Sequence, residues 1–149
     1  KHGNFSKTLH VTSTAGTQVL TVTVVLPDEP PNSRDNNQRV AAVDRQAVFR
    51  GDCATCHTVP LAGRTGAELF VVACGICHFA SHRAAMVPDL LSPREPRDAA
   101  YWQKWIGEGK PGTLMPGFAI NQGGPLTDDQ IVSLVAYALN HLPKEPRKD

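Results

Sequence analysis

The chain has 149 residues, of which 41% are hydrophobic, and its formal net charge is +1. This length suits one compact domain with an appendage and excludes two large domains. The balanced charge predicts neither nucleic acid nor an acidic membrane surface as a partner. No apolar run is long enough to cross a bilayer, and the first residues lack a signal-peptide pattern, so an exported protein would be a processed or truncated chain. One local basic cluster is interpreted as a solvated face, with a docking patch as the alternative: Arg94, Arg97, Lys104 and Lys110.

The first segment, residues 1–26, is predicted to be a β-hairpin extension. Thr and Val alternate with period two across residues 6–26, on both sides of a turn near Ala15 and Gly16. The stretch resembles the final strands of an Ig-like β-sandwich module. Because an isolated hairpin is marginally stable in water, we expect it to pair with strands of a further N-terminal portion or of a partner chain.

Residues 27–38 are polar and rich in proline, which is typical of a linker. Helical signals begin at Arg39. A short helix is predicted over residues 98–107. The last helix is predicted within residues 126–142, where Thr127 and Gln130 form a capping-box pattern before an apolar stripe at helical spacing.

The pattern Cys-x-x-Cys-His occurs twice, at residues 53–57 and 74–78. The surrounding residues form a short repeat, "AVFRGDCATCH" and "ELFVVACGICH", so each motif is predicted to end a helix with an apolar face. In exported proteins this pattern attaches haem covalently. Two cysteines three residues apart lie on one side of a helical turn and can both bond one porphyrin edge, while the adjacent histidine ligates the iron.

Other uses of the four cysteines remain open on spacing alone. Two Cys-x-x-Cys pairs separated by 17 residues fall within the spacing of zinc ribbons. A pair of disulfides is a further alternative. Both leave the histidines His57 and His78 without a role, and zinc gives none to the methionine of "GTLMPGF", so haem is favoured.

Residues 66–142 resemble a class I cytochrome c. The resemblance rests on four stretches in order: "GAELFVVACGICH", "MVPDL", "GTLMPGF" and "LTDDQIVSLVAYAL". It implies a mainly α protein with the class I cytochrome c fold around haem, in a domain at residues 66–149. It also implies that Gly66 and Phe70 pack on the C-terminal helix and face Tyr137.

The resemblance assigns the residues of this haem site. Cys74 and Cys77 would attach the haem, and His78 would ligate its iron. The carbonyl of Pro88 would accept a hydrogen bond from the Nδ1–H of His78, and Leu90 would pack on the haem. Met115 would be the sixth ligand of the iron.

The first motif departs from the family, because no distal loop follows it before the second motif. Cys53, Cys56 and His57 would attach a first haem within residues 39–65, which would lie against the second haem under a helix from Arg39 to Phe49. His82 leads the candidates for its sixth ligand, because it lies four residues beyond His78. The others are His2, His10, His141 and Met86. If Met115 instead served this haem, the second motif would be inert.

We therefore predict a dihaem c-type cytochrome with two covalently bound haem c groups, which transfers single electrons and is not an enzyme. It would work on the periplasmic or another extracytoplasmic side. Its partners would be redox proteins, including a membrane-bound oxidase, quinol-oxidising or photosynthetic complex. Two alternatives are a haem subunit of a larger membrane complex, attached through the hairpin, and a catalytic or sensing haem with an open position at the first iron.

Overall fold

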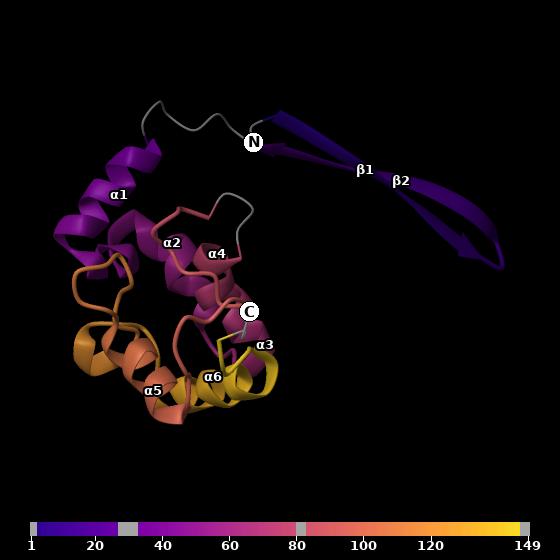
Figure 1. Ribbon diagram of the computed structural model, residues 1–149. Coiled ribbons are helices and arrows are strands. Elements are labelled where there is room, and N and C mark those ends of the chain that lie inside the picture. The colour runs from indigo at the N-terminus through magenta and orange to yellow at the C-terminus, as the bar shows by residue number, and fades with distance from the viewer. Residues whose placement is uncertain (1–2, 27–32, 80–82, 147–149) are drawn as a thin grey trace. The chain divides into compact units, whose positions relative to one another are not determined.

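The computed structural model describes residues 3–26, 33–79 and 83–146 (Figure 1). The chain divides into two compact units, Lys1–Asn37 and Gln38–Asp149. The segments predicted at residues 39–65 and 66–149 therefore lie in one unit. Among the described residues, no helix is long and apolar enough to cross a membrane.

The first unit contains an antiparallel pair of strands, β1 (Gly3–Ser13) and β2 (Gly16–Leu26). Ser13 pairs with Gly16 across the turn, so the expected hairpin is confirmed, although it begins at residue 3 rather than 6. Every side chain in residues 4–25 is exposed. These two strands form the whole sheet within the described ranges, and pairing with strands of another segment or chain stays a prediction.

Helix α1 (Ser33–Val43) begins inside the segment predicted to be a linker, so helical structure starts before the expected Arg39. The polar side chains at residues 35–37 and 39 of this helix are exposed. Asp35 in the first turn favours this helix, because a negative charge stabilises the positive end of the helix dipole. Residues 27–32 of the predicted linker lie outside the described ranges.

The predicted helix from Arg39 to Phe49 is interrupted at Asp44. Asp44 has an extended backbone, and its Oδ1 accepts a hydrogen bond from the Gln46 N–H at 3.0 Å. Aspartate commonly caps a new helical turn in this way, which ends the preceding helix. The 3₁₀ helix η1 (Arg45–Phe49) follows the break, so a single continuous helix was the wrong prediction.

The two motifs rest on different helical supports. The first lies on two short turns, η2 (Gly51–Cys53) and α2 (Ala54–His57). Gly51 has a φ of 53°, a left-handed conformation that glycine tolerates and that breaks the helix before the motif. The expected helix ending in the motif is therefore wrong for the first copy.

The second motif does end a continuous helical run, as predicted. This run consists of α3 (Gly66–Phe70), the π-helical turn η4 (Val71–Gly75) and α4 (Ile76–His78). A π turn inside an α-helix often occurs at a functional site, because it changes the direction of the side chains that follow.

Helices α5 (Ala99–Glu108) and α6 (Asp128–His141) are both capped at their N-termini. The Asp98 carboxylate accepts a hydrogen bond from the Tyr101 N–H at 2.7 Å. At α6 the predicted capping box is confirmed, with reciprocal bonds between Thr127 and Gln130. Two short 3₁₀ helices, η3 (Val59–Leu61) and η5 (Ile120–Gln122), complete the second unit.

The core of the second unit lies where α6 packs against α3 and α5 (Figure 1). The Phe70 and Tyr137 rings lie 4.8 Å apart, and the Gly66 N–H donates to Ser133 Oγ at 3.2 Å, so the expected packing of α3 on the C-terminal helix is confirmed. The innermost side chains are Leu61, Leu69, Leu126, Ile131 and Leu134. Burying each such side chain contributes about 1.5–3 kcal/mol.

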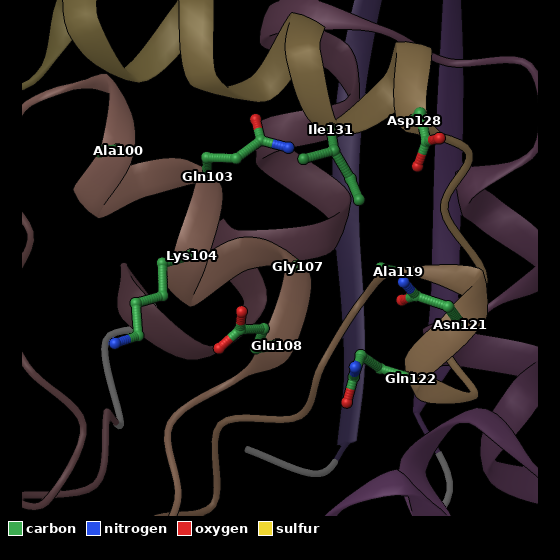
Figure 2. Close-up of a pocket in the computed structure, with 10 residues that line it drawn as sticks. All are labelled: Ala100, Gln103, Lys104, Gly107, Glu108, Ala119, Asn121, Gln122, Asp128 and Ile131. Atoms are coloured by element: carbon green, nitrogen blue, oxygen red, sulfur yellow. The ribbon is translucent and has the colours of Figure 1, made fainter.

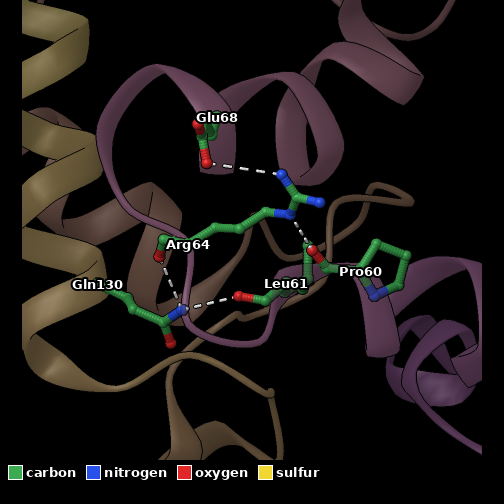
Figure 3. A network of polar contacts seen from close by, with 5 residues as sticks. All are labelled: Pro60, Leu61, Arg64, Glu68 and Gln130. Carbon is green, nitrogen blue, oxygen red and sulfur yellow. Dashed lines mark hydrogen bonds and ion pairs between the residues drawn. The ribbon is translucent and has the colours of Figure 1, made fainter.

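Leu61 joins the segment after the first motif to this core, since only 2% of it is exposed. Figure 3 shows how α6 also holds this segment: Gln130 Nε2 donates to the carbonyls of Leu61 at 3.0 Å and Arg64 at 3.1 Å. Arg64 Nε donates to the Pro60 carbonyl at 2.7 Å, and its guanidinium pairs with Glu68 at 3.6 Å. The residues that follow the first motif therefore make polar contacts with both α3 and α6.

Candidate functional site

The second motif brings two thiols and an imidazole to the end of one helical run. Cys74 is half-buried and Cys77 is exposed. Burial, with a smaller contribution from Cys77, raises the pKa of the Cys74 thiol to about 12, and burial also raises the pKa of Cys77. Both thiols therefore remain protonated at neutral pH. A nucleophilic cysteine needs the opposite shift, so this pair is not built for nucleophilic catalysis.

The expected hydrogen bond between His78 and Pro88 is present. His78 Nδ1 lies 2.9 Å from the Pro88 carbonyl oxygen, which can only accept, so Nδ1 carries the proton. Burial is the largest influence on the pKa of His78 and lowers it, although the bond to Pro88 acts in the other direction. The neutral ring then presents the lone pair of Nε2, the form in which histidine binds a metal.

A cavity opens beside His78 and collects most of the residues predicted for the second site. Phe70, Leu90, Trp102, Trp105, Ile106 and Ala138 supply apolar or aromatic walls. Cys74, His78, Pro88 and Met115 also line it. The free space between these side chains is about 60 Å³. The cavity thus gathers a thiol, a neutral imidazole and a thioether among apolar walls.

Arg97 differs from the solvated basic residue that the sequence predicted, because it is only 5% exposed. Its Nη1 donates to the Leu90 carbonyl at 3.0 Å, and its guanidinium carbon lies 5.4 Å from the centre of the Trp102 ring. Its Nε is buried without a hydrogen-bond partner among the described residues. A buried guanidinium N–H without a hydrogen-bond partner is unfavourable, so an acceptor beside this cavity wall would stabilise Arg97. A negatively charged acceptor would form the strongest such bond.

Met115 lies in a tight loop after α5. The Met115 N–H donates to Thr113 Oγ1 at 3.2 Å, and the Lys110 N–H donates to the Met115 carbonyl at 3.2 Å. Gly109 begins the loop with a φ of 69°, and a Cβ there would lie 2.4 Å from the carbonyl carbon of Pro116. Only glycine fits this close approach, which brings the methionine back to the end of α5.

The first motif contributes no residue to the lining of this cavity. Cys53 and Cys56 are exposed, and His57 is half-buried. Burial lowers the pKa of His57, so its imidazole is also neutral at neutral pH. Cys56 and His57 lie on α2 and Cys53 is its N-cap residue, which gives the spacing that covalent attachment needs.

Two of the candidates for a sixth ligand of the first site, Met86 and His141, are described in the same unit as the first motif. His82, the leading candidate, and His2 lie outside the described residues. His10 lies on the hairpin of the other unit, and Met86 is 63% exposed. The ring of His141 stacks on Tyr137 at 4.5 Å, which places it near the second motif through Phe70.

The alternatives to haem, a zinc site or disulfides, require cysteine sulfur atoms to lie close to one another. Among the described residues, no three His, Cys, Asp or Glu side chains gather where they could hold a metal ion, and all four cysteines are free. A four-cysteine zinc site would require the two pairs to converge. This geometry therefore favours separate roles for the two pairs.

A larger depression of about 540 Å³ lies between α5, α6 and η5, away from both motifs (Figure 2). Gln103 and Lys104 of α5, Asn121 and Gln122 of η5, and Asp128 of α6 give it a polar lining. Neither a thiol nor an imidazole lines it, whereas Cys74 and His78 line the other cavity. We assign the functional site to the cavity beside His78.

Sequence reasoning missed two kinds of residue around the site. Arg97 was missed because an arginine among other charges gives no signal of burial. Gln46 was missed because its side chain bonds to the backbone of Gly117, which is 71 residues away. Neither contact leaves a local pattern that could have revealed it.

The helical wrap of α3, α5 and α6, with a Cys-x-x-Cys-His helix and a methionine loop facing one cavity, is the arrangement of a c-type cytochrome domain. A family model described as cytochrome C oxidase, cbb3-type, subunit III matches residues 61–137, which are 77 of the 149 residues. The chain belongs to this family. Neither a curated protein nor a solved structure matched the chain.

Membership in this family confirms the predicted cytochrome c segment. The domain is a cytochrome c domain, with a covalently bound haem c and a role in electron transfer. The match begins at Leu61, five residues before the predicted boundary at Gly66, which agrees with the burial of Leu61 in the core.

Proposed function

We propose that this protein is a dihaem c-type cytochrome that transfers single electrons between redox partners on the extracytoplasmic side of a membrane. One haem would be held by Cys74, Cys77, His78 and Met115. The other would be held by Cys53, Cys56 and His57. The observation that carries the proposal is the single cavity that Cys74, His78 and Met115 share, with His78 oriented by Pro88.

The residues of the second site fit haem in chemistry. Cys74 and Cys77 would attach its edge, the neutral His78 would supply nitrogen to the iron, and Met115 would supply sulfur. The orphaned Nε of Arg97 would gain an acceptor from a haem carboxylate. The fit rests on these donors and apolar walls rather than on the free space.

Haem c supplies an iron that accepts and releases one electron. The chain contributes the rest: Leu90, Trp102 and Ile106 exclude water from the cavity, and two protein ligands leave no position for a substrate. Pro88 fixes the orientation of His78, so a change of oxidation state requires little movement. An electron carrier needs this arrangement more than it needs a substrate pocket.

The sixth ligand of the first site remains a prediction, with His82 in the lead. Two histidines would stabilise the ferric state and give this site a lower potential than the histidine–methionine site. Electron paramagnetic resonance of the oxidised protein tests this ligand. The low-spin signal of one site should change in His82→Ala, and unchanged signals at both sites would exclude His82.

The family description favours a second candidate role within the same function, a haem subunit of a membrane-bound terminal oxidase. The redox partner would then be that oxidase, and the exposed hairpin is one means of attachment. This role and that of a separate carrier differ in association. A subunit co-purifies with the membrane complex in mild detergent, whereas a carrier is recovered alone.

Haem counting tests the main proposal. A pyridine haemochrome assay on the purified protein should give two haems per chain, and one haem per chain contradicts the dihaem proposal. Exposure of the reduced protein to carbon monoxide tests the carrier role, because an iron with two protein ligands should not bind it. A spectrum that changes with carbon monoxide would instead indicate an open, catalytic or sensing site.

A further inference from the structure

The side-chain amide of Gln46 pairs with the backbone of Gly117, two residues after Met115. Its Nε2 donates to the Gly117 carbonyl at 2.8 Å, and its Oε1 accepts from the Gly117 N–H at 2.9 Å. Nε2 also donates to the Gln122 carbonyl at 2.6 Å. The amide has two N–H donors and one carbonyl acceptor, so every polar group of this side chain is used on the loop.

The backbone N–H and carbonyl of Gly117 depend on Gln46 for their hydrogen bonds. The residue is buried, and no other hydrogen bond to its N–H or carbonyl occurs among the described residues. Buried backbone groups without partners are costly, so loss of the amide would expose both groups or leave both unsatisfied. A Cβ on Gly117 would lie 2.9 Å from the Glu108 carbonyl carbon and from Gln122, which shows how closely the loop is packed here.

The rest of η1 supports the same contact. The ring of Phe49 meets Phe118 edge to face at 5.1 Å, and Arg45 Nη2 donates to the Glu108 carbonyl at 3.3 Å. The Asp44 cap fixes the backbone of Gln46 itself. The short helix before the first motif therefore lies on the loop that carries Met115, and Gln46 is its central polar contact.

We propose that Gln46 is a positioning residue for Met115. By fixing Gly117, it keeps the loop closed and the methionine sulfur directed into the cavity, and it links the first-motif segment to the second site. The inference rests on the proposed function, in which Met115 ligates the iron above His78. Gln46 itself is not among the residues that line the cavity.

The test compares Gln46→Ala and Gln46→Glu with the wild type in the oxidised, haem-loaded full chain. Glutamate keeps the length of the side chain but replaces its donors with a carboxylate facing two carbonyl oxygens. The readout is the near-infrared sulfur-to-iron charge-transfer band during an alkaline titration, in which a competing ligand displaces the methionine. Losing these bonds should ease the displacement by about tenfold, which lowers the midpoint by about one pH unit.

Gln130→Ala is the matched control, since this residue also uses its amide on two distant carbonyls (Figure 3). Its bonds hold Leu61 and Arg64 rather than the methionine loop. The control should lower resistance to denaturant and leave the alkaline midpoint within about 0.3 pH units of the wild type. Equal shifts in the Gln46 and Gln130 variants, or no shift in either Gln46 variant, would overturn the inference.

Amide exchange of the wild type gives an answer even where no Gln46 variant assembles with haem. The Gly117 N–H should be strongly protected, and exchange at the rate of an exposed loop amide would refute the contact. The wild-type band separates this inference from the proposed function. A wild type without the band removes Met115 as ligand, whereas a wild type with the band and unshifted Gln46 variants removes only the role of Gln46.

Discussion

The two Cys-x-x-Cys-His motifs share a local pattern but have different surroundings. Around the second, Cys74 is half-buried, His78 is hydrogen-bonded to Pro88, and a cavity with apolar walls leads to Met115. Around the first, both cysteines are exposed, and none of its residues lines the cavity beside His78. The motif can specify attachment because its residues are adjacent in the chain. The second iron ligand and the walls come from residues far away, so the motif cannot specify them.

The largest expected effect comes from removing each pair of cysteines. Cys74→Ser with Cys77→Ser should abolish the folded cytochrome core, because the haem proposed to attach there would pack against the apolar walls of the cavity. Cys53→Ser with Cys56→Ser should keep the fold and the near-infrared band and lose one haem. The measurements are haem content and the near-infrared spectrum. Equal damage from both double variants would contradict the difference between the two sites.

Replacing Met115 sharpens the comparison, because only the second site is proposed to have a methionine ligand. Met115→Ala should abolish the sulfur-to-iron band and lower the potential of that site by on the order of 0.1 V, a modest part of the range that axial ligands control. Met86→Ala is the control, since Met86 is 63% exposed and does not line the cavity. A band that persists in Met115→Ala, or disappears in Met86→Ala, shows that the assignment is wrong.

A smaller effect tests whether the residues just after the first motif are part of the hydrophobic core. Leu61→Ala should lower the free energy of unfolding by about 2–5 kcal/mol, because it leaves a cavity in a packed core. Val59→Ala, two residues earlier and 67% exposed, should change it by at most about 0.5 kcal/mol. Denaturant titration measures both. Similar values for the two variants would mean that the segment is not part of the core.

Much of the second site could be predicted because its parts carry local signals. The capping box at Thr127 and Gln130, the short helix before Gly109 and the contact between His78 and Pro88 each follow from a recognisable stretch. These stretches also occur in a fixed order along the chain. This order resembles that of class I cytochromes c, and the resemblance implies the helical wrap.

The region before the second motif could not be predicted as well. The break at Asp44 arises because aspartate can either sit inside a helix or cap a new turn, and the sequence does not decide between them. The pairing of Gln46 with Gly117 joins residues that only the folded chain brings together. The burial of Arg97 likewise depends on the aromatic wall beside it.

A potentiometric titration of the purified full chain tests the central claim most directly, because it counts the redox centres and compares them at once. Two proposed haems with different axial ligands predict two one-electron steps at distinct potentials, with the higher step belonging to the histidine–methionine site. A single one-electron step would contradict the account, and so would two electrons taken up at one common potential.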